Sequence, residues 1–361
     1  MAVFTYKCPN CDGGLEFNAA KQKFVCEYCM SEFTMDELKA HFNEEELSKQ
    51  AEQDAKEERE HIHEHTHNEE DGDMLMYNCP SCGAEIVTDA TTAASFCYYC
   101  HNPVVLSGRL AGEYKPDLVI PFTIERKEAE NRLLEWIKTK KLAPNDFYGK
   151  ENIEKMSGVY FPFFLVSEKI NGNLNAEAHN VRTWISGDTE HTERNIYHVA
   201  REGTIILKNI TKNALNKEEK VLVDNVLPFD MKKSKPFSMA YLSGFFAEKR
   251  NLEIDSFKEE IKAEVMQYTE NILRDTLDNY DELHSVHVET HVKARKNQYA
   301  LMPVWVLTYK GNDKIYYYAM NGQTGKICGD VPISMKKLLI RFLCVAAPIF
   351  AALCILGGLL L

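Results

Sequence analysis

Eight cysteines in two identically spaced blocks are the residues of this chain best suited to chemistry. In the first block, the pair Cys8–Cys11 is followed after fourteen residues by the pair Cys26–Cys29. The same spacing recurs 71 residues later, with Cys79, Cys82, Cys97 and Cys100. A C-x2-C pair places two thiolates on one tight turn, and two such turns close a tetrahedron around a metal ion. The spacing therefore predicts two metal sites, each with four cysteine ligands.

The donor set indicates which metal to expect and in which role. Four thiolates leave no open coordination position, which is the structural and not the catalytic form of a zinc site. We therefore predict two structural Zn²⁺ ions in tandem zinc ribbons, where Gly13 and Gly83 suit the sharp bend after each C-x2-C pair. Iron stays an alternative, because the spacing does not separate the two metals. Disulfides are disfavoured by the repeat, and the paired cysteines indicate a reducing compartment.

Length, charge and composition limit the remaining classes of protein. A chain of 361 residues with 45% hydrophobic residues predicts several folded units. Its formal net charge of -12 argues against a general nucleic-acid binder, because phosphate contacts need a basic face. The first ribbon has a few cations, Lys7, Lys21 and Lys23, and the second has almost none. Residues 1–7 lack the apolar core of a signal peptide, so no secretion signal is expected there.

The first ribbon, residues 1–33, is followed by a helix and an acidic linker, residues 34–73. Thr34 is the expected N-cap of the helix, with Glu37 as its capping-box partner. The linker should let the ribbons reach outward. It contains four alternating histidines that could bind a transition metal, although a polar linker without metal is the alternative: His61, His63, His65 and His67. The second ribbon follows at residues 74–106.

Residues 107–250 are expected to form an α+β domain. It should contain a strand at 118–122, a helix at 125–141, a buried strand at 159–166 and an antiparallel meander at 170–210. The predicted turns of the meander are Gly172, Asn180 and Gly187–Asp188. Residues 251–335 predict a smaller α+β unit, in which a helix capped by Ser256 and Glu259 precedes three strands.

The last segment, residues 336–361, predicts a membrane anchor. Residues 342–361 contain no charged side chain and would span about 30 Å as a helix. Basic residues just before this run favour a cytoplasmic flank: Lys336, Lys337 and Arg341. We therefore expect a single-pass protein of the cell membrane that contacts the lipid bilayer through residues 338–361, with its N-terminal bulk in the cytoplasm. The predicted fold class is α+β multidomain, with two small β zinc ribbons, mixed antiparallel-sheet α+β middle and C-terminal units, and one C-terminal transmembrane helix.

A search for catalytic chemistry finds no active site. Residues 321–326 resemble a phosphate-binding loop, but the first glycine of that motif is replaced by Met320, so a turn is predicted. Spaced by four along a strand, His287 and His291 would lie about 13 Å apart, too far for one metal ion, so a solvent-facing row is expected. The other histidines outside the linker also fall on or near strands: His179, His191, His198 and His284. We predict no catalytic residue, no small-molecule substrate and no enzymatic activity.

Several further motifs extend beyond the cysteines, and with the two ribbons they resemble membrane-anchored TFIIB-type zinc-ribbon proteins of Gram-positive bacteria. Members are often labelled as transcription-factor-like or as relatives of the primosomal helicase, and some are implicated in tethering SPFH-domain or membrane-stress assemblies. The resemblance covers nearly the whole chain and implies structure and partners, not an active site. The missing nucleotide loop argues against helicase activity. The motifs that carry the resemblance are residues 118–122, 158–163, 197–203, 241–247 and 320–326.

Two functions from different classes follow from these observations. The first is a non-enzymatic, zinc-binding adaptor tethered to the cytoplasmic face of the membrane, where rigid ribbons contact protein partners. The second is a membrane-associated nucleic-acid-binding regulator of transcription or replication restart, which rests on the ribbon type alone and is disfavoured by the acidic chain. A third hypothesis is an enzyme whose active site lies in the central meander. Only convergent polar groups in a pocket would support it.

Overall fold

The computed structural model describes residues 3–42, 74–80, 85–89, 91–97, 102–110, 112–144, 156–216, 220–311, 314–329 and 333–360, and also residues 49, 52, 53 and 331. The chain divides into two compact units, each built from separate stretches of sequence. Unit 1 comprises Met1–Pro162, Leu215–Lys249 and Leu301–Leu361, and unit 2 comprises Phe163–Ala214 and Arg250–Ala300.

The first cysteine block forms short strands and one helix. Strand β1 is Val3–Phe4, and β2 (Leu15–Asn18), β3 (Lys23–Cys26) and β4 (Glu32–Phe33) form a three-stranded sheet in that order. Helix α1 is Met35–His41, and the predicted capping box is confirmed, with Thr34 as N-cap and Glu37 as its partner. The helix ends at its C-cap Phe42, whose backbone is extended.

The second cysteine block repeats the same strands. They are β5 (Met74–Asn78), β6 (Glu85–Asp89), β7 (Thr92–Phe96) and β8 (Pro103–Leu106). Shifting β1 to β4 by 71 residues places each of them on β5 to β8 in turn. Part of the pairing repeats as well: β3–β4 pairs Phe24↔Phe33 and Val25↔Glu32, and β7–β8 pairs Ser95↔Val104 and Phe96↔Pro103 at the same shift. The bridge Lys7↔Gly14 likewise recurs as Asn78↔Glu85 in β5–β6. In the described residues the repeat is therefore one of strand position and also of strand register.

Most of the described strands join one mixed sheet of eleven strands. Its main path is β1-β8-β7-β13-β10-β14-β15-β16, with β11 paired to β10, and β9 paired to β12 and β14. The long members are β10 (Ser157–Ser186), β11 (Thr189–Asn213) and β14 (Glu282–Gly311). The short members are β9 (Leu118–Val119), β12 (Lys235–Pro236), β13 (Phe246–Glu248), β15 (Lys314–Asn321) and β16 (Ile327–Gly329).

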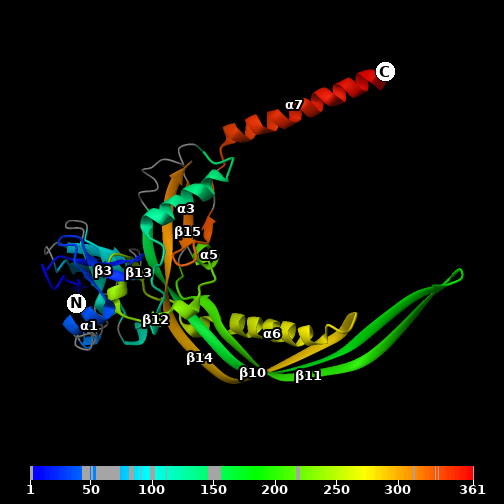
Figure 1. Ribbon diagram of the computed structural model, residues 1–361, viewed down its shortest axis with the longest axis horizontal. Helices are drawn as coiled ribbons and strands as arrows, with labels where there is room; N and C mark the ends of the chain where they lie inside the picture. The colour runs from blue at the N-terminus through cyan, green and yellow to red at the C-terminus, as the bar shows by residue number, and fades with distance from the viewer. Residues whose placement is uncertain are drawn as a thin grey trace, which may run out of the picture. The chain divides into compact units, whose positions relative to one another are not determined.

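Unit 1 contains helix α3 (Arg126–Lys138) and a buried cluster of aromatic side chains. Phe122 stacks on Phe245 with ring centroids 4.2 Å apart, and Trp305 packs 4.9 Å from the Phe122 ring. Figure 1 shows α3 beside β15, and the rings of Trp136 and Tyr318 meet at 6.0 Å. The remaining helices are α5 (Lys220–Asp224), α7 (Met335–Leu360) and short 3-10 turns at η1 (Ser107–Leu110), η2 (Gly112–Tyr114), η4 (Met231–Lys233) and η5 (Met239–Leu242).

Unit 2 consists of long strand segments covered on one face by helix α6 (Lys258–Arg274), with η6 (Ile254–Phe257) before it and η7 (Asp275–Leu277) after it. Figure 1 shows α6 lying along β10, β11 and β14. The buried cluster beneath the helix includes Leu174, Ala176 and Ala178 of β10, with Leu273 and Leu277. The helix is also attached through Lys212, whose Nζ contacts Glu264 at 2.7 Å and Glu260 at 3.1 Å.

The predicted fold class is wrong in its middle and C-terminal parts. The expected meander at 170–210 is one hairpin, because β10 pairs with β11 from Phe163↔Asn213 to Ser186↔Thr189. Only the predicted turn at Gly187–Asp188 reverses the chain, whereas Gly172 and Asn180 lie inside β10. Separate antiparallel α+β units are replaced by one large mixed sheet with few helices, because β10 and β14 are long enough to pass from one unit into the other.

The predicted C-terminal transmembrane helix also has to be corrected. Among the residues that the structure describes, no helix is long and apolar enough to cross a membrane. The first turns of α7 carry three basic side chains, Lys336, Lys337 and Arg341, and Pro348 lies inside the helix. The tail anchor, the single-pass membrane location and the bilayer contact through residues 338–361 are therefore not supported.

Candidate metal centre

The four cysteines of the first block lie together at one end of the β2–β3–β4 sheet. Cys8 Sγ is 3.5 Å from Cys29 Sγ, and Cys11 Sγ is 3.5 Å from Cys26 Sγ. All four sulfur atoms lie within 4.8 Å of one another. Zn–S bonds of about 2.3 Å in a tetrahedron require sulfur atoms about 3.8 Å apart. The predicted ligand set of this block is thus brought together, and the cluster could hold one metal ion.

Two similar turns position these ligands. In the first, the Cys8 N–H donates to the Gly13 carbonyl oxygen and the Asp12 N–H donates to the Cys8 carbonyl oxygen. In the second, the Cys26 N–H donates to Ser31 O and the Met30 N–H donates to Cys26 O, with the same spacing along the chain. Asp12 and Met30 each follow the second cysteine of a pair and adopt left-handed φ values of 59° and 58°. The chain therefore bends identically around both sides of the sulfur cluster.

Gly13 is required at this bend for a different reason from the predicted one. Its φ is not in the left-handed region, which falls on Asp12 instead. A Cβ atom at Gly13 would approach Tyr28 Cδ2 to 2.5 Å and Cys26 Sγ to 3.3 Å. The glycine therefore allows the Tyr28 ring to lie against the first turn. The corresponding Gly83 lies outside the described residues.

Without a bound metal ion, the cysteine thiols of the cluster differ in their pKa values. Burial raises the pKa of Cys8. A hydrogen bond with Ser31 lowers the pKa of Cys29 to about 6, since Ser31 Oγ lies 3.2 Å from the sulfur. A metal ion needs all four groups as thiolates, so its binding would release protons. Such a site suits a metal ion with high thiolate affinity.

The second block can be followed only in part. Cys79 and Cys97 are buried, and each directly follows a strand, β5 and β7 respectively. The Cys97 N–H donates to Asn102 O at 3.0 Å, which reproduces the five-residue bond that starts from Cys8 and Cys26. The other two predicted ligands, Cys82 and Cys100, lie outside the described residues, as do the linker histidines His61, His63, His65 and His67.

The first ribbon is packed against other parts of unit 1, contrary to the expectation that a linker lets it reach outward. The Phe17 N–H donates to Ser243 O at 3.0 Å, and Ser243 Oγ donates to Leu15 O. The Phe17 and Tyr241 rings meet at 5.3 Å. In addition, β1 pairs with β8 of the second block through Val3↔Leu106. The β2–β3 face is thus covered, and the metal end of the ribbon is left to face solvent.

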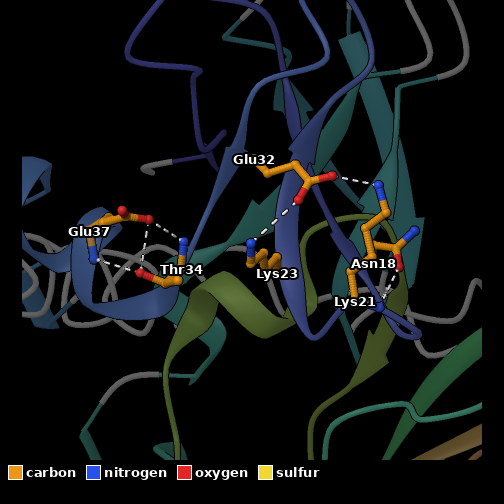
Figure 2. Close-up of polar contacts among 6 residues, drawn as sticks. All are labelled: Asn18, Lys21, Lys23, Glu32, Thr34 and Glu37. Atoms are coloured by element: carbon orange, nitrogen blue, oxygen red, sulfur yellow. Dashed lines mark hydrogen bonds and ion pairs between the residues drawn. The ribbon is translucent and has the colours of Figure 1, made fainter.

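Figure 2 shows how the cations of the first ribbon are arranged around Glu32. Lys21 Nζ lies 2.5 Å from Glu32 Oε1, and Lys23 Nζ lies 3.5 Å from Glu32 Oε2. The hydrogen bond from Lys21 lowers the pKa of Glu32, which keeps the carboxylate charged. The same view shows the Thr34 and Glu37 capping box beside this group. These lysines therefore carry less uncompensated charge than the sequence indicates.

Two large, exposed side chains lie at the metal end of the ribbon, and their exposure was not predicted from the sequence. Tyr28 is 71% exposed and Met30 is 72% exposed, although both belong to the turn that carries Cys26 and Cys29. Aromatic residues and methionine are enriched in protein interfaces. The available signal was their position inside and just after a C-x2-C pair, on the turn that carries two of the predicted ligands.

The predicted turn at 321–326 is present and connects two strands. Asn321 begins the predicted turn at 321–326, and its Nδ2 donates to Val226 O at 2.9 Å and Pro228 O at 3.1 Å. The Gly325 N–H closes the turn on Asn321 O at 2.9 Å, so this segment connects β15 to β16 and is not followed by a helix. His287 and His291 are both exposed, as predicted.

The chain is similar to one curated protein, the uncharacterized protein YdjG of Bacillus subtilis (strain 168). The two are 29% identical over 329 residues, which cover 78% of this chain and 96% of that protein. No protein-family model matches the chain. No solved structure matches it significantly.

Proposed function

We propose that this protein is a non-enzymatic, zinc-stabilised adaptor that binds a protein partner through the metal end of its first ribbon. The observation that carries the proposal is the exposure of Tyr28 and Met30 on the turn that holds Cys26 and Cys29. Because a metal ion fixes that turn, the two side chains are held in one arrangement, which lowers the entropy lost on binding. In this proposal both cysteine blocks hold a structural Zn²⁺ ion.

The arrangement of the ribbon supports a role in presenting this end. Contacts with Tyr241 and Ser243 hold the opposite face of the ribbon against unit 1. The turn with Tyr28 and Met30 therefore projects from a fixed support. A rigid apolar pair rimmed by polar groups is typical of a small binding anchor in a protein interface.

The nucleic-acid-binding alternative gains less support from these contacts. Lys21 and Lys23 both contact Glu32, whose charge offsets theirs. Exposed ion pairs contribute little to stability, so the lysines could exchange Glu32 for phosphate. Salt-dependent binding of DNA or RNA by the full chain would favour this alternative, because phosphate contacts weaken as salt rises.

Site-specific photocrosslinking tests the adaptor proposal. A photoreactive phenylalanine derivative replaces Tyr28 in the full chain, within the cells that make the protein, and a second version carries it at Tyr268, which is 47% exposed on α6. We expect a discrete protein adduct from position 28 that position 268 does not give. The adduct should be lost in Met30→Asn, which keeps the left-handed turn because asparagine tolerates that conformation. Equal adducts at both positions, or no adduct with zinc bound, would contradict the proposal.

A further inference from the structure

A second group of metal-ligating side chains lies in unit 2, far from the cysteines in sequence. His179, Glu282 and His284 each direct one ligand atom into a space where all three atoms lie within 4.8 Å of one another. His284 Nε2 is 3.2 Å from Glu282 Oε2, and His179 Nδ1 is 3.9 Å from the same oxygen. Bonds of about 2.0–2.2 Å to nitrogen and oxygen in a tetrahedron require ligands about 3.4 Å apart. The spacing fits one small metal ion.

The state of His179 is the second observation that points to a ligand. This residue is only 6% exposed, and its Nδ1 atom has no hydrogen-bond partner in the structure. A buried nitrogen without a partner costs about 1–3 kcal/mol, so such atoms are rare unless they serve a purpose. The Nδ1 atom faces the Glu282 carboxylate at a distance too long for a hydrogen bond. A cation between the two would satisfy both groups.

Glu177 prepares the His179 ring for this role. His179 Nε2 lies 2.8 Å from Glu177 Oε1, so an Nε2–H donates to that carboxylate and the lone pair is left on Nδ1. Histidines that bind metal ions usually donate their other N–H group to a carboxylate in this way, which sets the tautomer and the ring orientation. Glu177 is thus a positioning residue and not a ligand.

The backbone brings the two parts of the cluster together. The Asp281 N–H donates to His179 O at 3.0 Å, and the Val181 N–H donates to Asp281 Oδ2 at 2.7 Å. These bonds attach the start of β14 to β10, so that Glu282 and His284 follow at alternate positions on one face of the strand. Because Ala178 packs in the cluster beneath α6, the neighbouring His179 points to the other face of the sheet.

We propose that His179 Nδ1, Glu282 Oε2 and His284 Nε2 form a binding site for a divalent transition-metal ion. Two imidazoles and one carboxylate suit zinc, iron, nickel or copper better than magnesium or calcium. Glu282 and His284 are about half exposed, so the site opens to solvent and the ion keeps positions for water or an added ligand. The site does not depend on the cysteine clusters or on the proposed adaptor role.

Zinc binding by the full chain tests the proposal. All measurements use a parent in which His61, His63, His65 and His67 are replaced by asparagine, so that the linker cannot supply the ion. After the cysteine sites are saturated, native mass spectrometry and competition with a chromophoric chelator measure further Zn²⁺. We expect one additional ion in the parent, and at least about tenfold weaker binding of that ion in His284→Ala, because a ligand is lost.

Two further variants make the result specific. His287→Ala is the matched control, since His287 is an exposed histidine on the same strand and contacts Glu289 at 3.5 Å. Its zinc binding should equal that of the parent. Glu177→Gln keeps all three ligands and should weaken the additional ion by about 10–100-fold. Absence of an additional ion in the parent, or equal binding by His284→Ala and His287→Ala, would overturn the proposal. Circular dichroism of each variant verifies that unit 2 stays folded.

Discussion

The cysteine cluster of the first ribbon and the histidine cluster of unit 2 are built by the chain in opposite ways. The cysteine ligands lie within one segment of 22 residues, from Cys8 to Cys29, on two local turns. The ligands of the second cluster come from β10 and from the start of β14, about one hundred residues apart. The short ribbon folds around the first cluster, whereas the second cluster lies on a sheet that would form without a metal ion. A metal ion should therefore stabilise the first region strongly and the second only slightly.

Removing one cysteine gives the largest effect that this comparison predicts. Cys26→Ser should lose one Zn²⁺ ion per chain and unfold the first ribbon, since metal binding and folding are coupled in such small domains. The matched control is Cys328→Ser, which removes a thiol that lies on β16, outside the cluster. Zinc content and limited proteolysis of residues 1–42 measure the effect. By contrast, His284→Ala should change the free energy of unfolding of unit 2 by no more than about 0.5 kcal/mol relative to wild type. Similar losses of stability in the first ribbon and in unit 2 would contradict the predicted difference between the two metal clusters.

Removing the ion pairs between Lys212 and α6 tests how much this contact contributes to the stability of unit 2. Lys212 is largely buried, which opposes its charge, but the hydrogen bonds that it donates to Glu264 and Glu260 raise its pKa. Lys212→Ala should lower the free energy of unfolding of unit 2 by about 2–3 kcal/mol, less than for a fully buried pair because the carboxylates are partly exposed. The neighbouring exposed residue gives the control Lys208→Ala, which should be neutral. Urea denaturation followed by circular dichroism measures both. Equal effects of the two changes would contradict this account.

Filling the space at Gly13 tests how tightly the first cluster is packed. Gly13→Ala should lower the free energy of unfolding of the ribbon by about 1–3 kcal/mol, because its Cβ would meet the Tyr28 ring. Gly203→Ala is the control, since nothing lies within 4 Å of a Cβ atom there. Combining Gly13→Ala with Tyr28→Ala should restore part of the loss. Thermal melting with zinc bound measures all three proteins, and a double variant no more stable than Gly13→Ala alone would refute the contact.

The pH dependence of the first ribbon is the smallest predicted effect. Burial, together with the charge of Glu27, raises the pKa of Glu16 from 4.5 to about 7. The unfolded chain loses this proton near pH 4.5, whereas the folded protein keeps it until about pH 7. The free energy of unfolding therefore falls as pH rises from 4.5 to about 7, and the loss stays constant above pH 7. Glu16→Gln should therefore be more stable than wild type by about 1–2 kcal/mol at pH 8, and by less at pH 5. Denaturation at both pH values measures the difference, and an equal difference at the two values would contradict the prediction.

The parts of the structure that the sequence predicts are those encoded over short distances. The cysteine spacing, the Thr34 and Glu37 capping box and the helix near 125–141 each depend on neighbours a few residues apart, and all three are present. The pairing of β14 with β15 from Val304↔Asn321 to Gly311↔Lys314 was also predictable, because a short connection joins the two strands.

The long strands could not be predicted, because their turn-like residues serve other purposes. Gly172 was interpreted as a turn, yet it lies in β10 where a Cβ atom would meet Thr269 Cγ2 of α6 at 2.6 Å. The glycine therefore makes room for the helix. The predicted cap at Ser256 fails for a related reason: α6 begins after Phe257, which is buried, and its N-cap makes no side-chain hydrogen bond. Packing against distant strands determines both positions, and the histidine cluster depends on the same pairing.

The interleaving of the two units has a consequence for the order in which a nascent chain can fold. The last piece of unit 2 ends at Ala300, and unit 1 still needs Leu301–Leu361. On a ribosome, the first ribbon emerges first and can take up its metal ion alone, and unit 2 can close next. The sheet of unit 1 can be completed only when Leu301–Leu361 has emerged. A translation pause near Ala300 would therefore leave unit 2 complete while unit 1 still lacks the last of its three segments.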